Sequence, residues 1–355
     1  MAYQNVGSPR FYINVMEWLH SINGLTSYTN LDMIFTNPER GLTTPTKDYA
    51  WSGNEDRPFF PEPVIPLREL IGDKGFVAHL GHNYASCELS VQVDQGEPLW
   101  GAAEYIENII NAEKLSPVSN QMKPDYDGFS IYLADYTNQA PQTNPRLFYN
   151  YNGIDQQNIY NGLDVKVGSI ILGPYWECHS PDLKLTMTRE MDGVKSIRTK
   201  GGSDLVNHKY IKAPIWTDEN GVGGSAWELY SGNQTNKTLS RSGRRAWNLS
   251  FSYLQDSDLF PDVGSLTNYE SISPDGNVWS DEDNVTLNTL LDDNNFYSQV
   301  IHKTNGGQNR FLFQADSSNN NIDQFAVCKL DMSSFQFKQV ANNIYNVKLK
   351  IREVW

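Results

Sequence analysis

The chain has 355 residues, which is enough for two domains of ordinary size, and a formal net charge of -14. Such a charge repels nucleic-acid phosphates and anionic membrane surfaces over most of the protein, so we expect neither specific nucleic acid nor membrane as a partner. Only 20% of the residues are charged and 12% are aromatic, a mixture that favours exposed β-sheets and loops.

Cysteine usage favours assembly in a reducing cytoplasm. Cys87, Cys178 and Cys328 lie far apart, and an odd number of cysteines cannot form a closed disulfide framework. We interpret them as small buried side chains. No apolar stretch approaches the roughly 20 residues that span a bilayer, and the first residues lack the pattern of a signal peptide. We therefore do not expect secretion by that route.

The first third of the chain mixes clear and ambiguous signals. Residues 11–20 predict either a strand or a short helix, because they combine strand formers with a helical pattern. Prolines up to Pro66 exclude central strands and predict an extended arm or long loop. Apolar and polar residues alternate over 87–94, which predicts a half-buried strand. Residues 102–115 place Tyr105, Ile106, Ile109 and Ile110 at helical spacing and predict a helix packed on a sheet.

A strand is expected at 129–133, and a long polar stretch then runs from 136 to 162. We place a domain boundary in this stretch. The prediction is an N-terminal β-rich domain with a Pro-rich arm over residues 1–160, followed by a β domain over residues 161–355.

Strand signals are stronger in the second half. A strand is expected at 165–172, and the segments 183–189 and 194–200 predict a hairpin. Asp192 and Gly193 supply its turn, because this dipeptide tolerates the positive φ that a two-residue hairpin loop requires. Large apolar residues alternate with small polar ones over 247–253, which predicts a further strand.

The end of the chain predicts a short helix and three strands. The helix covers residues 294–304, with Asn294 or Asn295 as its cap and Gly306 and Gly307 at its end. The strands cover 310–313, 324–329 and 345–351. The expected fold is mainly β, a barrel or sandwich with one or two short helices.

Few residues suggest chemistry. His79, His82 and Cys87 have a spacing that could hold a soft metal, but no second ligand pair follows. Cys178 and His179 are neighbours that would point to opposite faces of a strand. Acidic runs at 256–258 and 280–283 match no calcium loop, and we interpret them as solvated loops. Phosphate-binding loops, nucleophile elbows and zinc-protease motifs do not occur. We expect no catalytic residue, no metal and no cofactor, and hence no enzymatic activity.

Two regions, residues 240–260 and 296–355, resemble the distal tail proteins of long-tailed bacteriophages. The first has basic residues before a Trp-x-Leu-x-Phe strand. The second has a short helix, a Gly-Gly turn and a Tyr-Asn-Val-Lys-Leu-Lys-Ile-Arg-Glu ending, and the segment 168–202 also fits. The resemblance implies a tail-tube-like β-barrel that forms a homo-oligomeric ring, a hexamer or trimer, at the distal end of the tail tube. It implies a virion tail protein, assembled in the host cytoplasm, that connects the tube to the tail tip or baseplate.

Two places are candidates for the subunit interfaces of such a ring. Arg241, Arg244 and Arg245 precede one strand and could bridge to acidic groups of a neighbouring subunit. The alternative is a solvated loop with one structural salt bridge. The expected hairpin tip at Asp192 and Gly193 is the second candidate, as a subunit contact.

Other function classes stay open at this point. Tyr and Trp residues in polar stretches, such as those from Tyr149 to Tyr160, would suit a carbohydrate- or receptor-binding module. A capsid decoration protein is a structural variant of the same hypothesis. A polysaccharide-degrading enzyme would need two carboxylates in one groove, and the sequence nominates no such pair.

Overall fold

A computed structural model provides the fold. It describes the following residues, to which every structural statement below is confined: 5–22, 25–28, 57–59, 61–63, 74–82, 88–94, 106–110, 112–116, 119–124, 128–135, 146–152, 169–183, 185–190, 195–207, 244–261, 294–321 and 324–354.

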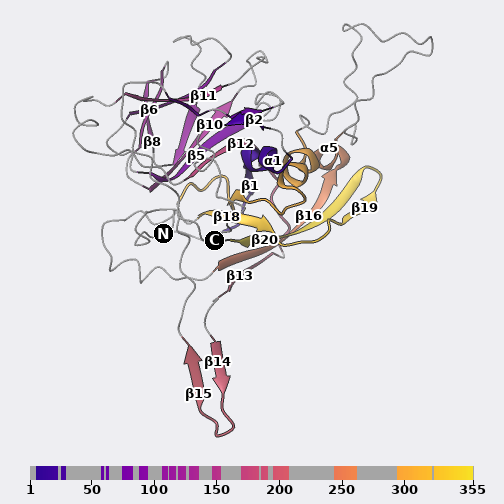
Figure 1. The fold of residues 1–355 in the computed structure, drawn as a ribbon. Coiled ribbons are helices and arrows are strands. Elements are labelled where there is room, and N and C mark those ends of the chain that lie inside the picture. Colours follow the sequence, from indigo (N-terminus) through magenta and orange to yellow (C-terminus); the bar gives the residue numbers. More distant parts are fainter. Residues whose placement is uncertain are drawn as a thin grey trace.

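Eleven strands form one antiparallel sheet (Figure 1). Its order is β13-β16-β20-β18-β17-β1-β12-β5-β10-β7, and β19 also pairs with β20. The strands are β1 Arg10–Ile13, β5 Lys74–His82, β7 Ile106–Ile110, β10 Gly128–Asp135, β12 Ser169–Glu177, β13 Thr186–Glu190, β16 Arg244–Gln255, β17 Phe311–Gln314, β18 Phe325–Leu330, β19 Phe337–Ala341 and β20 Ile344–Glu353.

Three smaller sheets and a few short helices complete the described part. A five-stranded sheet has the order β3-β11-β6-β9-β8, and β2 and β14 pair with β4 and β15 respectively. These strands are β2 Leu25–Tyr28, β3 Arg57–Phe59, β4 Pro61–Pro63, β6 Glu88–Asp94, β8 Ala112–Ser116, β9 Ser119–Pro124, β11 Arg146–Asn152, β14 Lys195–Arg198 and β15 Asp204–Asn207. The helices are α1 Val15–Ser21, α5 Asp256–Leu259, the π-helix η5 Tyr297–Ile301 and the 3-10 helix η6 His302–Thr304.

The prediction of a mainly β protein with few short helices is confirmed, but the prediction of a closed barrel is wrong. Among the described strands, β13 pairs only with β16 and β7 only with β10, so the two ends of the large sheet do not meet. The sheet takes strands from both sides of residue 160, because β5 pairs with β12. The division into domains 1–160 and 161–355 stays a prediction.

The first strand is central. β1 lies between β12 and β17, with Phe11 opposite both Trp176 and Phe313. Phe11 and Ile13 belong to one hydrophobic core, whereas Tyr12 belongs to another. Because successive side chains of a strand point to opposite faces, β1 contributes to a core on each side of the sheet. Gly173 of β12 permits this packing, since a Cβ there would lie 1.9 Å from the carbonyl oxygen of Ile13.

Residues 11–20 form both of the elements that the sequence allowed, a strand followed by a short helix. β1 ends at Ile13, and Asn14 caps α1 by accepting a hydrogen bond from the Glu17 backbone N–H at 3.4 Å. Val15, Met16 and Leu19 of α1 are fully buried. The short sequence therefore changes from strand to helix at its capping asparagine.

The helix expected at 102–115 is wrong. Residues 106–110 form β7 and residues 112–116 form β8. Ile106 and Ile110 are four residues apart, a spacing that places side chains on one face of a strand as well as of a helix. The β-branched isoleucines favour the strand.

The hairpin expected between 183–189 and 194–200 is also wrong. β13 pairs with β16, and β14 pairs with β15 through a turn at Thr199–Ser203. The Thr199 N–H donates to the Ser203 carbonyl at 2.8 Å, and Gly202 adopts a φ of 86°, which glycine allows. Asp192 and Gly193 lie outside the described residues.

Several other described elements follow the prediction, but β11, within the polar stretch 136–162, and β5, β9 and β19 were not expected as strands. Of the expected strands at 87–94 and 165–172, residues 88–94 form β6 and residues 169–172 belong to β12, and residues 129–133 belong to β10. Residues 87 and 165–168 lie outside the described residues. Residues 247–253 lie within β16, and Val347, Leu349 and Ile351 of β20 are buried as expected. Asn295 caps the terminal helix by accepting from the Ser298 N–H at 2.8 Å. Gly306 and Gly307 follow η6 with positive φ. The prolines of β3 and β4 lie in strands at sheet edges, consistent with their missing N–H groups.

A buried ion pair joins β16 to the last strand. The Arg245 guanidinium donates to both carboxylate oxygens of Glu353 at 3.0 Å and to the Phe325 carbonyl at 2.7 Å. Both side chains are more than nine-tenths buried. The guanidinium also lies 5.3 Å from the centre of the Trp247 ring. The guanidinium and both carboxylate oxygens thus have hydrogen-bond partners, as buried charges require.

We predict that Arg245→Ala lowers the free energy of unfolding by about 3 kcal/mol, because it leaves the Glu353 carboxylate buried without its partner. Arg352→Ala is the matched control. It removes the ion pair of Arg352 with Glu190, two side chains that are each about one-third exposed. We expect it to lower the free energy of unfolding by less than about 1 kcal/mol. Urea denaturation of both variants measures the difference. Equal losses would show that the buried pair contributes no more than the exposed one.

His302 provides a pH-dependent contribution to stability. Its ring packs against Trp18 at 5.3 Å, and its buried Nε2 has no hydrogen-bond partner among the described residues. Burial, together with the charge of Lys303, lowers the pKa of His302 to about 4 from the usual 6.5. The unfolded chain therefore binds a proton between these values that the folded chain does not.

We predict that stability falls as the pH drops from about 6.5 towards about 4, and that His302→Gln reduces this slope. Thermal unfolding of the wild type and the variant across this pH range provides the measurement. Parallel curves would show that His302 does not contribute.

Candidate functional site

The β14–β15 hairpin, which we call the arm (residues 195–207), projects from the body of the protein (Figure 1). Of its residues whose exposure is described, all are exposed except Thr199. Ile197 lies opposite Leu205 in the strand pairing, so the two side chains share one face. They are 65% and 61% exposed.

An isolated two-stranded hairpin is marginally stable in water, and the pair of Ile197 and Leu205 leaves most of its apolar surface exposed to water. Burying one such side chain would contribute roughly 1.5–3 kcal/mol. The arm thus has the properties of a segment that packs against another surface.

The arm is basic although the chain is acidic. Lys195, Arg198 and Lys200 outnumber the single carboxylate of Asp204, which gives the arm a formal charge of +2. The whole chain has a charge of -14, so the remainder of the chain has -16. An acidic protein surface is therefore an electrostatic match for the arm.

A second exposed feature, Tyr253, lies near the C-terminal end of β16. The pairing of β16 with β20 shifts between Phe251 and Leu254, and this bulge turns Tyr253 outward. Tyr253 has a φ of 61° and is 79% exposed. Its backbone N–H donates to the Asn346 side chain at 3.2 Å. A bulky residue in the left-handed region costs about 1–2 kcal/mol, so the backbone presents this ring at a cost.

Acidic residues lie close to Tyr253 along the chain and against its neighbour Ser252. Asp182 accepts a hydrogen bond from the Ser252 hydroxyl at 2.8 Å, and the next residue, Leu183, is fully exposed. Asp256 and Asp258 begin α5 immediately after β16. Asp258 also lies 3.6 Å from the His179 ring. We call this surface the acidic patch; it comprises Asp182, Leu183, Tyr253, Asp256 and Asp258.

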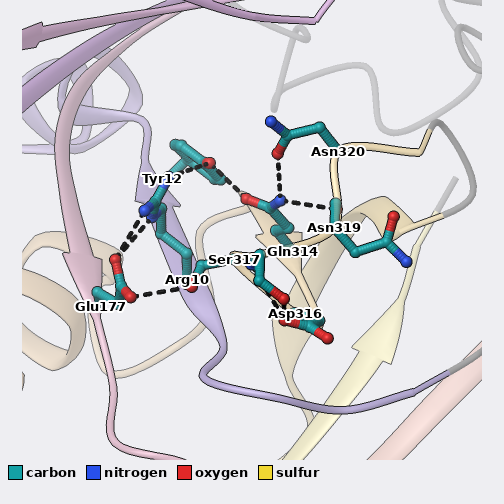
Figure 2. Close-up of polar contacts among 9 residues, drawn as sticks. Arg10, Tyr12, Glu177, Gln314, Asp316, Ser317, Asn319 and Asn320 are labelled. Atoms are coloured by element: carbon teal, nitrogen blue, oxygen red, sulfur yellow. Dashed lines mark hydrogen bonds and ion pairs between the residues drawn. The ribbon is translucent and has the colours of Figure 1, made fainter.

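A polar network fixes β1 near its start (Figure 2). Arg10 donates to Glu177 at 2.7 Å, and Ser317 donates to the other oxygen of that carboxylate at 2.9 Å. The Tyr12 hydroxyl donates to Gln314 at 2.7 Å. The Gln314 amide nitrogen in turn donates to the backbone of Asn319 and to the side chain of Asn320. These contacts join β1, β12 and the loop after β17.

The electrostatics of this network indicate a structural role. Burial alone would raise the pKa of Glu177, but the hydrogen bonds from Arg10 and Ser317 outweigh it and the pKa is lowered. Burial raises the pKa of Tyr12, so its hydroxyl keeps its proton. The carboxylate is thus a poor general acid and the phenol a poor base near neutral pH.

The residues expected from the sequence to form subunit interfaces do not lie together in the described part of the chain. Arg241, Asp192 and Gly193 lie outside the described residues. Arg244 begins β16, opposite Glu190 of β13, and is half-buried. Arg245 is buried in β16, not in a solvated loop, and pairs with Glu353. The role of these residues in a subunit interface stays a prediction.

The candidate chemical residues give no site in the described part. Cys178 is buried, which raises its pKa, whereas the His179 side chain is exposed. His79 and His82 belong to β5, but their side chains, Cys87 and residues 280–283 lie outside the described part. Among the described residues, no group of three or more His, Cys, Asp or Glu side chains could hold a metal. No described helix is long and apolar enough to cross a membrane.

Sequence reasoning missed the arm and the acidic patch. The Gly201-Gly202 pair between Ile197 and Leu205 was an available hairpin signal. The exposure of Tyr253 had no such signal, because the alternation of residues 247–253 places it with the buried side chains.

No protein-family model, no curated protein and no solved structure matches the chain.

We predict that Tyr253→Gly changes the free energy of unfolding by less than about 1 kcal/mol, with the sign towards greater stability, because glycine relieves the positive φ. Phe251→Ala, two residues earlier in the same strand, removes a buried ring and should cost about 3 kcal/mol or more. Chemical denaturation of both variants provides the comparison. A large loss for Tyr253→Gly would mean that the exposed ring stabilises its own chain.

Proposed function

We propose that the chain is a non-enzymatic structural subunit of a tailed-bacteriophage virion. In this proposal it forms a homo-oligomeric ring at the distal end of the tail tube and connects the tube to the tail tip or baseplate. The observation that carries the proposal is the projecting arm, whose apolar pair Ile197 and Leu205 is exposed in the single chain.

The arm supports an assembly role because its exposed apolar side chains gain stability only through contact with another surface. A subunit that functions within a larger particle can keep such a segment, since the contact forms on assembly. β13, the last described strand before the arm, is hydrogen-bonded along β16 within the large sheet.

The acidic composition is consistent with the proposed location. A net charge of -14 disfavours adhesion of a DNA backbone to the protein. A ring at the end of a tail tube surrounds the path of the DNA, so a repulsive lining would let the DNA pass. The resemblance of residues 240–260 and 296–355 to distal tail proteins supports the same location.

We predict that immunogold labelling of intact virions of the source phage, with antibodies raised against this protein, marks only the tail end distal to the capsid. The purified protein should form ring-shaped particles in negative stain, with a mass that is a small multiple of 40.3 kDa. An antibody against the major capsid protein is the control for labelling. Label on capsids or fibres, or no label on virions, would reject the tail-tip proposal.

A further inference from the structure

We propose that the basic arm of one copy binds the acidic patch of a second copy of this chain. This inference rests on the proposed ring and names the contact that would build it. The arm contributes Lys195, Ile197, Lys200 and Leu205, and the patch is the surface around Tyr253 defined above.

The charges of the two surfaces are complementary. The arm carries a formal charge of +2, whereas the patch combines Asp182, Asp256 and Asp258 with the exposed ring of His179. Opposite charges across an interface increase the rate of encounter and fix the orientation of the partners. Like charges would otherwise separate copies of a chain whose net charge is -14.

The apolar groups also match. The arm exposes the pair of Ile197 and Leu205, and the patch exposes Tyr253 and Leu183. An exposed tyrosine flanked by charged groups is a typical centre of a protein interface, because its ring is large and rigid. In the single chain, the arm and the patch both leave their apolar side chains in water.

The two surfaces lie at opposite ends of β16, so the arm of one chain does not reach the acidic patch of the same chain. Arg244, opposite Glu190 at the end of β13 that precedes the arm, begins β16. Tyr253 lies nine residues further along, a span of about 30 Å in an extended strand. In Figure 1 the arm and α5 accordingly lie at different ends of the molecule. Contact between an arm and the next patch is heterologous, and such contacts generate rings when the rotation closes.

Charge reversal in the full-length protein tests the proposal. Lys195→Glu with Lys200→Glu should weaken self-association about tenfold or more, measured by sedimentation velocity. Asp182→Lys with Asp256→Lys, which changes the formal charge of the patch from -3 to +1, should also weaken it. Combining all four substitutions in one chain should restore association, because the arm, at -2, and the patch, at +1, then again have opposite charges. Circular dichroism and thermal melting verify that each variant is folded.

The matched control is Lys74→Glu with Lys350→Glu, on exposed positions of β5 and β20. It changes the net charge by the same amount as the arm variant but leaves the arm intact. We expect it to associate as the wild type does. If it weakens association as much as the arm variant, the effect belongs to net charge and the proposal is rejected.

A zero-length carbodiimide cross-linker identifies the contact directly, because it joins amines only to carboxylates that touch them. In mixtures of 15N-labelled and unlabelled protein, Lys195 or Lys200 of one isotope should join Asp182, Asp256 or Asp258 of the other. Rings without these intermolecular links would overturn the arm–patch contact.

The result separates this inference from the proposed function. Tail-end label together with charge variants that assemble normally would reject the arm–patch contact and keep the tail-tip role. A wild-type chain that stays monomeric at every concentration and gives no label on virions would reject both.

Discussion

The fold depends on the backbone hydrogen bonds of β1. This four-residue strand pairs with β12 on one side and β17 on the other, and it connects the strands β12, β5, β10 and β7 to the strands β17, β18, β20, β16 and β13. Without it, the large sheet would divide into two pieces, each with a new unpaired edge of backbone groups. The network from Arg10 to Glu177 and Ser317 fixes the register at its start. Segments distant in sequence must therefore fold together.

Strands with one buried face were predictable from the sequence, whereas their partners were not. β16 and β20 alternate large apolar and polar residues with a period of two, and that period identifies a strand without knowledge of its neighbours. Pairing depends on contacts far away in the chain. The dipeptide of Asp192 and Gly193 after β13 has a high turn propensity in the sequence, yet β13 pairs with β16, more than 50 residues distant. Local turn propensity predicted the wrong partner for this reason.

The candidate site shows the same division. Three arginines near the start of β16 are evident in the sequence, but whether such an arginine is buried, and which group it pairs with, depends on residues elsewhere in the chain. Arg245 contacts the Trp247 ring and meets Glu353, which is 108 residues away. The period of two that places Trp247 on the core side of β16 also places Arg245 there, but its charged partner Glu353 lies on a distant strand that no local pattern identifies. Likewise, the outward position of Tyr253 arises from a bulge, where one extra residue reverses the expected alternation.

A strongly acidic subunit meets a physical obstacle when it assembles with its own copies, because their surfaces repel each other. Screening by salt weakens this repulsion beyond about 10 Å but leaves close contacts unfavourable. A local region of opposite charge removes the obstacle at one place only, and therefore also selects the orientation of the partners. The arm has that property, and it places an apolar pair beside its lysines. Charge would then bring the copies together in one orientation, and burial of the apolar side chains would hold them there.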